Sequence, residues 1–600
     1  MASKISDATI PGGPSSEPLS WVSATATRAY CKSDPLIDWL NLYGEAAGFT
    51  RDDHLPRHDS RTDFLGFILR QGQSFERAVL GHLNDTVAPL TVICTEREDV
   101  QSEDKLQATI DAMASAKPLI AQAVLWNRGR RTYGATDILI RSDVLRQLFP
   151  ELITEEEAHI GALKLGIPYH YRVVDVKFST LGLLKDGHLG GPQVHYMAQV
   201  WIYNDALGEM QGFEPPAAYI LGRGWSASGD QRGRSCLERL GRVNRDFVLR
   251  NGTSLEDLVV DAVQWVRKVR SEGAGWHVLP EPSVPQLRPN MGHAEDQPWH
   301  DAKKRIADEL DELTLLWYVG LPGREEAHRA GITRWTDPEL TASHVGINGA
   351  RVAPTLNAIL EVNRSQDGPV IRPERIQAAD DQWRVPGPIE FYVDFETVSN
   401  LADDFSRIPE EGGQPLIFMI GCGHMEAGGW SFSQWTCDRL TEGSEERIID
   451  AWLAHMAAVS GSADLPALVI HWAPAEPLNY ELEYDAAKRR HPEKNWPVLR
   501  WFDFLNKVVK AEPVVVRGAM AFGLKAVARA MRLHGCIETE WTDGPTDGLG
   551  AMVGAWSCES EAAASGLRLV DVELMRKIGD YNEVDCKVMQ EMVGYFRRHH

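Results

Sequence analysis

Acidic residues in two short segments, far apart along the chain, have the types and spacing of metal ligands. Asp394 and Glu396 follow an apolar run, and Tyr581 and Asp585 lie in a later segment whose apolar residues have helical spacing. If residues 389–397 form a strand, Asp394 and Glu396 share one face, because side chains alternate along a strand. Tyr581 and Asp585 are four positions apart and share one face of a helix. These carboxylates predict a site for Mg²⁺ or Mn²⁺, which prefer oxygen ligands and promote phosphodiester cleavage in pairs.

A second set of candidate ligands lies in the first half of the chain. Glu76 lies at the margin of the apolar face of a helix-like stretch over residues 72–83, and Asp137 precedes an apolar run. Asp175 and Lys177 lie two positions apart on a segment of strand-like composition, so their side chains point the same way. A carboxylate beside a lysine can hold a metal and can orient or polarise a water near a phosphate.

Gln199 and Tyr203 complete this second set. They are four positions apart in the amphipathic stretch 195–207, so both side chains can face the same cleft. Spacing alone leaves open whether Gln199 and Tyr581 orient water or substrate, or only pack against their own helices.

The order of the first set resembles the RecB-type members of the PD-(D/E)xK nuclease superfamily. That family has a helix glutamate, a Gly-x-x-Asp, an acidic-x-Lys strand and a Gln-x-x-x-Tyr helix, matched here by Glu76, Gly134 to Asp137, Asp175-Val176-Lys177 and Gln199 to Tyr203. The resemblance implies a restriction-endonuclease-like α/β domain over residues 21–275. It also implies that three residues bind metal (Glu76, Asp137 and Asp175) and three serve catalysis (Lys177, Gln199 and Tyr203).

The second half resembles the YprB-type RNase H-like domain, a relative of the DEDD exonucleases. Its first motif matches Asp394-x-Glu396 and its last matches Tyr581-x-x-x-Asp585. The usual middle motif, His-Asn-x-x-Phe-Asp, aligns with residues 471–476, where Glu476 replaces the aspartate and keeps a carboxylate. The resemblance implies an RNase H-like mixed sheet over residues 386–600. The implied metal ligands are Asp394, Glu396, Glu476 and Asp585, and Tyr581 would position water.

Three further residues in this half bear on the second site. Asp503 is an additional acidic candidate, and Lys525 lies in a Gly-Leu-Lys element of the same family, where it would approach a phosphate. His471 is predicted to be structural, because hard-metal sites favour oxygen ligands.

Net charge conflicts with a nucleic-acid partner, whereas local charge favours one. The chain carries 62 basic and 85 acidic residues, a net charge of −23, and phosphate binding normally requires a positive surface. Seven arginines nevertheless lie within residues 223–250, and a smaller arginine group over residues 128–131 precedes Asp137. An arginine-rich solvated surface explains this pattern equally well. The residues predicted to contact nucleic acid are Arg131, Arg232, Arg234 and Lys525.

Composition along the chain predicts an α/β protein with several domains. Residues 1–20 are rich in Ser, Pro and Gly and predict a disordered tail, and a proline-rich linker is predicted over residues 276–300. Residues 301–385 have helical spacing and predict a helical connector. Its Gly331-Ile332 turn resembles a helix-hairpin-helix element that touches nucleic-acid backbone, although a packing spacer is the simpler interpretation.

Cysteine content and hydropathy exclude several protein classes. No apolar run is long enough to span a membrane, and residues 1–18 lack the pattern of a signal peptide, which predicts a cytoplasmic protein. The eight cysteines include no Cys-x-x-Cys pair, which argues against a zinc finger or a disulfide framework. Some RecB-type relatives hold an iron-sulfur cluster with four cysteines. One of these cysteines precedes the glutamate helix and three follow the Gln-x-x-x-Tyr helix. We expect no cluster here, because Cys31 could be the first but only Cys236 follows the Gln-x-x-x-Tyr helix within the first domain.

These observations predict a Mg²⁺- or Mn²⁺-dependent nuclease, an exonuclease with DNA as the favoured substrate, and with two candidate centres. One alternative is a nucleic-acid-binding scaffold for a helicase partner, with one or both centres inactive. Another is that only the first centre cuts while the second half serves as an assembly surface. The chain contains no Gly-x-x-x-x-Gly-Lys-Ser/Thr loop, so a motor would have to come from a partner.

Overall fold

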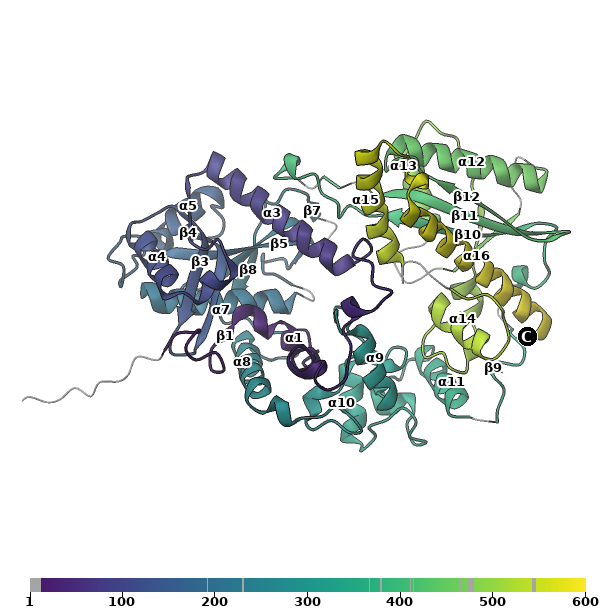
Figure 1. Ribbon diagram of the computed structural model, residues 1–600, viewed down its shortest axis with the longest axis horizontal. Helices are drawn as coiled ribbons and strands as arrows, with labels where there is room; N and C mark the ends of the chain where they lie inside the picture. Colours follow the sequence, from purple (N-terminus) through teal and green to yellow (C-terminus); the bar gives the residue numbers. More distant parts are fainter. Residues whose placement is uncertain are drawn as a thin grey trace, which may run out of the picture.

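The computed structural model describes residues 12–600 apart from 191–192, 229–230, 366, 378–379, 411, 414, 463–466, 473–479 and 542–546. Helices and strands are mixed along the described chain, which confirms the predicted α/β class. Two lobes each contain a sheet, and a helical segment joins them (Figure 1). None of the helices in the described parts is long and apolar enough to cross a membrane.

The first lobe is built on a mixed sheet of eight strands. The strand order is β2-β3-β4-β5-β6-β7, with β1 beside β4 and β8 beside β6. Three pairs are parallel, β1 with β4, β2 with β3 and β5 with β6, and the other pairs are antiparallel. The strands are β1 (Val22–Ser23), β2 (Leu90–Val92), β3 (Leu119–Asn127), β4 (Thr132–Arg141), β5 (Tyr171–Leu183), β6 (Ala217–Ala227), β7 (Gln231–Gly233) and β8 (Gly241–Asn244).

Helices cover both faces of this sheet, so its central strands are buried on both sides. Tyr171 and Val173 of β5 enter one core, and Val174 and Val176 enter another. This alternation is what a strand requires when both of its faces are covered. The helices of this lobe are α1 (Arg28–Cys31), α2 (Leu36–Trp39), α3 (Phe64–Thr86), α4 (Glu103–Ala114), α5 (Ser142–Leu148), α6 (Glu155–Ala158), α7 (Val194–Gln211), α8 (Leu255–Glu272) and α9 (His300–Glu309).

A partly charged insertion lies between Asp137 and β5 and packs on the sheet. Thr154 caps α6 by accepting a hydrogen bond from the backbone N–H of Glu157, at 3.1 Å, as its sequence indicates. Phe149 and Ala158 of the insertion pack in the core of Val174 and Val176, on the face of β5 opposite Asp175 and Lys177. Leu165 and Ile167, later in the insertion, pack against the core of Tyr171 and Val173 on the other face, so the insertion supports the sheet from both sides.

The second lobe contains a five-stranded mixed sheet. Its order is β12-β11-β10-β13-β14, antiparallel from β12 to β10 and parallel from β10 to β14. Its strands are β10 (Glu390–Val398), β11 (Leu416–Glu426), β12 (Gly429–Thr436), β13 (Leu468–His471) and β14 (Arg500–Asp503). Its helices are α12 (Glu442–Ser460), α13 (Tyr480–Arg490), α14 (Leu524–Leu533), α15 (Gly548–Ser565) and α16 (Glu573–His599).

The predicted linker and connector do not form a separate unit. Val278, Leu287 and Trp299 of residues 276–300 are buried in the core of the first lobe, because apolar side chains alternate with the prolines there. Helices α10 (Leu321–Arg329) and α11 (Val352–Arg364) share a core with the second lobe. A two-stranded sheet of β9 (Ile371–Arg372) and β15 (Val515–Val516) reinforces this attachment. Ile332 is buried in the same core, which favours the packing interpretation of its turn.

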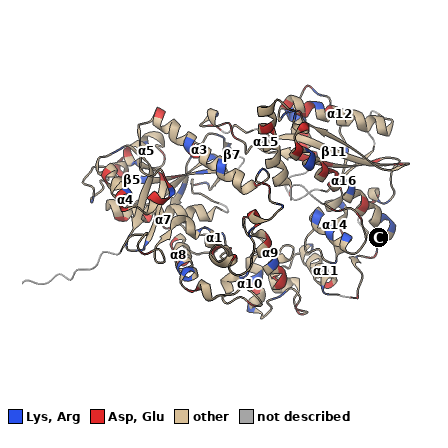
Figure 2. Ribbon diagram, viewed as in Figure 1, with Lys and Arg blue, Asp and Glu red and all other residues tan. Residues whose placement is uncertain are grey.

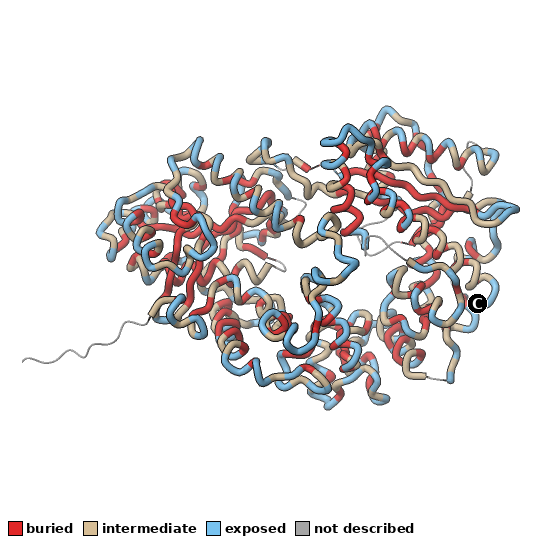
Figure 3. The backbone as a smooth tube through the Cα atoms, viewed as in Figure 1, coloured by how far each residue is buried: buried red, intermediate tan, exposed pale blue. Residues whose placement is uncertain are grey.

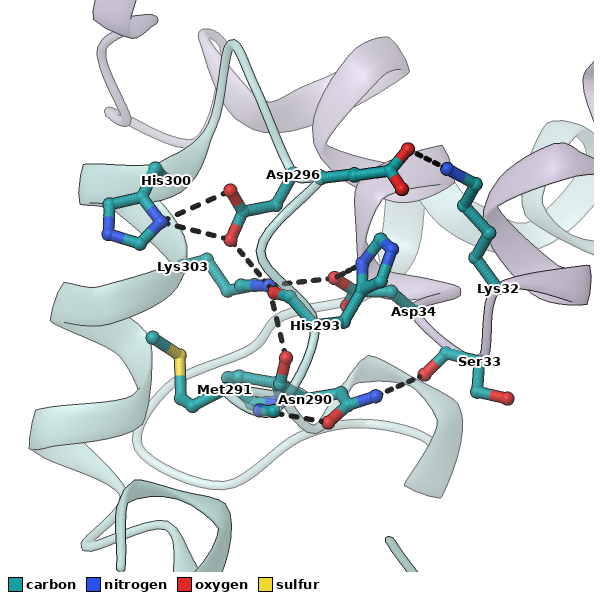
Figure 4. A network of polar contacts seen from close by, with 12 residues as sticks. Lys32, Ser33, Asp34, Asn290, Met291, His293, Asp296, His300 and Lys303 are labelled. Carbon is teal, nitrogen blue, oxygen red and sulfur yellow. Dashed lines mark hydrogen bonds and ion pairs between the residues drawn. The ribbon is translucent and has the colours of Figure 1, made fainter. Parts of the chain in front are cut away.

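A buried ion network holds residues 290–303 against the N-terminal segment (Figure 4). Lys303 of α9 is fully buried, and its Nζ lies 2.8 Å from Asp34 Oδ2 and 2.5 Å from Asp296 Oδ2. Its ammonium also donates to the backbone oxygens of Asn290 and His293. One lysine therefore pairs with two buried carboxylates and attaches the predicted linker segment to the first lobe.

Part of the predicted tail is also ordered. Residues 12–20 form turns, and the Trp21 indole N–H donates to the Gly12 carbonyl oxygen at 2.8 Å. Trp21 is buried against Trp126, which draws the preceding residues onto the lobe.

The lobes also touch where the chain leaves β10 (Figure 1). Phe405, in the segment between β10 and β11, contacts Phe75 of α3 and Phe178 of β5, at ring-centroid distances of 6.4 and 6.2 Å. Phe67 of α3 stacks on Trp556 of α15. The strand that carries Asp394 and Glu396 thus leads directly into a contact with the first lobe. Figure 3 shows that the buried backbone in each lobe follows the sheets and parts of the helices packed on them, and that exposed backbone lies around the outside.

Candidate metal centres

Three carboxylates predicted from the sequence converge in the second lobe. Asp394 and Glu396 lie on β10 and Asp585 lies on α16, and one ligand oxygen from each falls within 4.8 Å of the others. All three residues are buried. The predicted alternation of β10 is confirmed, since Phe391 and Val393 enter the core on the other face. We refer to Asp394, Glu396 and Asp585 as the second centre.

Asn582 fixes the orientation of one of these carboxylates and was missed by sequence reasoning. Its Nδ2 donates to Asp394 Oδ2 at 2.7 Å, and the residue is fully buried. Gly421, which pairs with Asp394 on β11, leaves room for it, because a Cβ there would lie 1.9 Å from Asn582 Oδ1. An asparagine inside the apolar stripe of a predicted helix was the signal that could have identified it.

Burial and mutual repulsion make the carboxyl groups of the second centre hold their protons more strongly than usual. Burial raises the pKa of Glu396 well above its ordinary value, and Asp394 and Asp585 raise it further. Burial likewise raises the pKa of Asp585 well above its ordinary value, with Asp394 as the next cause. Buried carboxylates that repel one another are stabilised by a bound cation. Their oxygens are the donor set that Mg²⁺ and Mn²⁺ prefer, so the residues fit such an ion.

Lys525, Trp541 and Tyr581 surround the second centre. The Trp541 indole N–H donates to Asp585 Oδ1 at 2.9 Å, and Lys525 Nζ lies 4.4 Å from the centroid of the Tyr581 ring. Burial raises the pKa of Tyr581, with Asp585 the next cause, so its hydroxyl keeps its proton. The pKa of Lys525 is lowered by its burial. The structure thus brings Tyr581 and Lys525 to the site and adds Trp541, which no sequence pattern indicated.

The other candidates of the second half lie elsewhere or are not described. Glu476 lies outside the described residues. Asp503 accepts hydrogen bonds from the backbone N–H and the side chain of Asn506, so it caps the turn after β14. Burial lowers the pKa of His471 to about 4, which makes it a neutral ring at the end of β13.

The predicted ligands of the first lobe also meet, in what we refer to as the first centre. Asp175 is buried and forms an ion pair with Lys177, which confirms that both point the same way from β5. Asp137 Oδ2 accepts the backbone N–H of Val176 at 2.7 Å. Gln122 of β3 donates from Nε2 to Glu76 Oε1 and, at 3.4 Å, to Asp137 Oδ1.

Gln122 is another residue that sequence reasoning missed. Its φ of 52° interrupts the ladder opposite Asp137, between the pairs Ala121 with Ile138 and Ala123 with Thr136. The amide therefore bridges Glu76 and Asp137 from an irregular strand position. The signal in the sequence was a single polar residue within an otherwise apolar strand.

Electrostatic coupling links the groups of the first centre. Burial raises the pKa of Glu76 and, to well above its ordinary value, that of Asp137, and Asp175 is the next cause for both. Burial acts to lower the pKa of Lys177, but the neighbouring carboxylates of Asp175 and Asp137 outweigh it, so the pKa is raised. Lys177 is therefore a fixed positive charge within a group of carboxylates.

Gln199 and Tyr203 contact each other beside the first centre. Gln199 Nε2 donates to the Tyr203 hydroxyl at 2.9 Å, on one face of α7. Burial raises the pKa of Tyr203, and Asp175 is the next cause. The glycine of the Gly-x-x-Asp pattern is needed here, because a Cβ on Gly134 would lie 2.5 Å from Tyr203 Cε1. The pattern thus encodes a close contact between β4 and α7.

The two centres differ in how their carboxylates are held. Among the described residues, the groups whose ligand atoms all lie within 4.8 Å of one another are the second centre and the set Glu446, His491 and Glu493. The first centre is not one of them, since Gln122 and Lys177 engage its carboxylates. Lys494 contacts Glu446 in the other set, and Glu445 accepts from His491 at 3.0 Å, so protein partners already serve that set.

The arginines predicted to contact nucleic acid differ in their surroundings. Arg131 occupies the turn between β3 and β4, six positions or ~20 Å of strand from Asp137, and lies 3.5 Å from Glu17. Arg232 and Arg234 are exposed beside β7. Arg223, from the same predicted cluster, is buried in an ion pair with Asp403 of the second lobe.

Taken as a whole, the chain has no match among family models, curated proteins or solved structures.

Proposed function

We propose that this protein is a divalent-metal-dependent nuclease that hydrolyses phosphodiester bonds in nucleic acid, with DNA favoured and exonucleolytic cleavage expected. The observation that carries the proposal is the convergence of Asp394, Glu396 and Asp585 into one buried group. We further propose that the first lobe is restriction-endonuclease-like and the second RNase H-like, in line with the motif order of each half.

The proposed metal ligands at the second centre are Asp394, Glu396 and Asp585. Those proposed at the first centre are Glu76, Asp137 and Asp175. A bound Mg²⁺ or Mn²⁺ supplies a Lewis acid that lowers the pKa of water and offsets charge on a phosphate. Asn582 holds the Asp394 carboxylate in one orientation by donating to its Oδ2. Without that donor, Asp394 could rotate away from the shared position.

Lys177 and Tyr581 are proposed to contact the phosphate and the attacking water rather than to bind the metal. Lys177 keeps its proton beside Asp175, so it offers a fixed positive charge to a non-bridging phosphate oxygen. Tyr581 is a neutral hydroxyl that can donate to or accept from an attacking water. Both groups are within their centres, which is the position that transition-state stabilisation requires.

The decisive experiment is cleavage of end-labelled single- and double-stranded DNA and RNA in the presence of Mn²⁺. We expect Asp394→Ala to remove the activity of the second centre, Asp175→Ala that of the first, and the double variant all activity. Unchanged cleavage by the folded double variant would remove the proposal. Exposed Asp381→Ala is the matched control.

A nucleic-acid-binding scaffold for a helicase is the alternative, and one observation favours it for the first centre. Its carboxylates are engaged by Lys177 and Gln122 and do not gather at one point. Calorimetric titration with Mn²⁺ distinguishes the cases. Two loaded centres support two active sites, one loaded centre supports a single nuclease with a binding lobe, and none supports the scaffold.

A further inference from the structure

A cavity of about 270 Å³ opens beside the second centre. This volume lies just below the ~300–1,000 Å³ of pockets that enclose a whole drug-sized ligand, so the cavity suits one ring system. The side chains that line it come from α14 and from the segment after that helix. They are Ala528, Arg529, Arg532, Leu533, Thr539, Glu540 and Trp541.

The helical wall of the cavity carries a line of positive charge. Lys525, Arg529 and Arg532 follow one another at spacings of four and three, so they share one face of α14. Figure 2 shows basic residues along this helix, in a chain whose net charge is −23. Arg529 is exposed, whereas Arg532 is held by Glu540 across the cavity. A phosphate chain that leaves the second centre along α14 would meet these cations.

The opposite wall is an aromatic ring that touches the metal ligands. Trp541 is half-buried, its N–H donates to Asp585 Oδ1 at 2.9 Å, and Lys525 Nζ lies 5.9 Å from its ring centroid. An aromatic face next to a line of cations is the combination that binds single-stranded nucleic acid without sequence preference. A single hydrogen bond joins this ring to Asp585, one of the proposed metal ligands.

Hydrogen bonds to α16 hold the segment that carries Trp541 in place. Glu591 of α16 accepts the backbone N–H groups of Glu538 and Thr539, at 2.8 and 3.0 Å. Asp585 and Glu591 are on the same helix, so the segment that ends at Trp541 is attached to α16 at two points. A preformed site loses less entropy on binding than a flexible one.

We propose that this cavity is a nucleotide subsite, in which one base of a nucleic-acid strand stacks on Trp541 while Arg529 contacts the adjoining phosphate. The inference deepens the proposed nuclease function by assigning a strand position to α14. The phosphodiester attached to the bound base would then lie toward Asp394, Glu396 and Asp585, because the Trp541 indole N–H is hydrogen-bonded to Asp585.

Binding of deoxyadenosine 5′-monophosphate to the full chain in EDTA tests the subsite without cleavage. Saturation-transfer NMR on the adenine H2 and H8 protons detects weak binding and locates it on the base. We expect Trp541→Ala to raise the dissociation constant about tenfold, the equivalent of ~1.4 kcal/mol. Trp541→Phe keeps a stacking ring but loses the N–H, so its dissociation constant should stay within about twofold of the parent.

Arg529→Ala provides a second test at an exposed position that does not support the fold. We expect it to weaken binding of the nucleotide and to leave binding of uncharged deoxyadenosine unchanged, since only the phosphate contact is lost. Arg329→Ala, an exposed arginine at the end of α10, is the matched control and should bind like the parent.

Two outcomes would overturn the subsite: absence of transfer to the adenine protons, or equal binding by the parent, Trp541→Ala and Arg529→Ala. Cleavage of DNA without nucleotide binding would remove the subsite and leave the nuclease proposal intact. Nucleotide binding that depends on Trp541 and Arg529, without any cleavage, would support the subsite and remove the nuclease proposal.

Discussion

Arg223 of the first lobe and Asp403 of the second form an ion pair whose side chains are only 2% and 4% exposed. Arg223 Nε lies 3.0 Å from Asp403 Oδ2, and the same guanidinium donates to the backbone oxygen of Asn400 at 2.6 Å. It also lies over the ring of Phe178, the residue after Lys177, at 4.9 Å from the centroid. The segment after β10 is therefore anchored beside the first centre, so the two centres share a structural support.

Asp403→Ala should destabilise the protein, because it leaves the Arg223 charge buried without its partner. Breaking a buried pair in this way costs ~3–5 kcal/mol. The expected result is a lower urea midpoint, together with weaker Mn²⁺ binding at the first centre as Phe405 loosens from Phe178. Tryptophan fluorescence and calorimetry measure the two effects. Exposed Arg407→Ala should change neither, and a midpoint for Asp403→Ala equal to that of the parent would contradict the prediction.

Asn582→Ala should weaken metal binding at the second centre more than it changes the fold. The substitution removes the donor to Asp394 Oδ2 without removing a carboxylate. Loss of a group that orients a metal ligand typically costs ~10–100-fold in metal affinity. Calorimetric titration with Mn²⁺ checks this value. The control is Asn363→Ala, which removes an asparagine from α11, far from the carboxylates in the sequence, and should leave the Mn²⁺ affinity unchanged. Equal Mn²⁺ affinities for the parent, Asn582→Ala and Asn363→Ala would argue against a role for Asn582.

The stability of the metal-free protein should fall with rising pH, and Mn²⁺ should reverse this fall. Glu396 and Asp585 have folded-state pKa values above the ~4 of unfolded carboxyl groups, so they bind more protons folded than unfolded. Their contribution is complete below the unfolded pKa and is lost as pH rises through the folded pKa. Because the metal binds the ionised form, the rise in melting temperature with Mn²⁺ should be larger at about pH 8 than at about pH 5.5.

The Glu396→Gln, Asp585→Asn double variant isolates this effect from other titrating groups. It retains the shape of the second centre but has only one of the three carboxylates. We expect a smaller fall in melting temperature with pH and a smaller increase with Mn²⁺ than in the parent. Identical pH profiles for the two proteins would show that these carboxyl groups do not titrate with raised pKa values.

The parts of the fold that sequence periodicity fixes locally were predictable. The alternation of β10 and the apolar stripes of α3 and α16 follow from residues within one element, and all three are confirmed. The placement of Glu76 on α3, of Asp175 on β5 and of Asp585 on α16 was therefore predictable as well. Local periodicity determines which face of an element a carboxylate occupies.

The residues that hold the carboxylates depend on contacts between distant segments, which one sequence does not reveal. Gln122 reaches Asp137 through an irregular position in β3, and Trp541 reaches Asp585 from a segment without periodicity. The attachment of the predicted proline-rich linker to the first lobe depends on distant contacts in the same way. Its prolines indicated a connection between domains, whereas its burial in the first core and the Lys303 network involve residues far away in the sequence.

Lys303→Met should destabilise the protein strongly, and less so in acid. The variant removes the ammonium shared by the buried Asp34 and Asp296 and leaves only His293 and His300 beside them, at a cost of ~3–5 kcal/mol near neutral pH. In the parent, burial acts to raise the pKa of Asp296, but its contacts with His300 and Lys303 lower it further than burial raises it. Without Lys303 the Asp296 carboxyl group should take up a proton more readily, so the loss should shrink as pH falls.

Urea unfolding of the parent and Lys303→Met at about pH 7 and about pH 5 measures both parts of this prediction. Lys304→Met is the matched control, because Lys304 is an exposed neighbour whose surface pair with Asp308 contributes little. A midpoint difference that is small and the same at both pH values would mean that other groups, not Lys303, neutralise the two buried carboxylates.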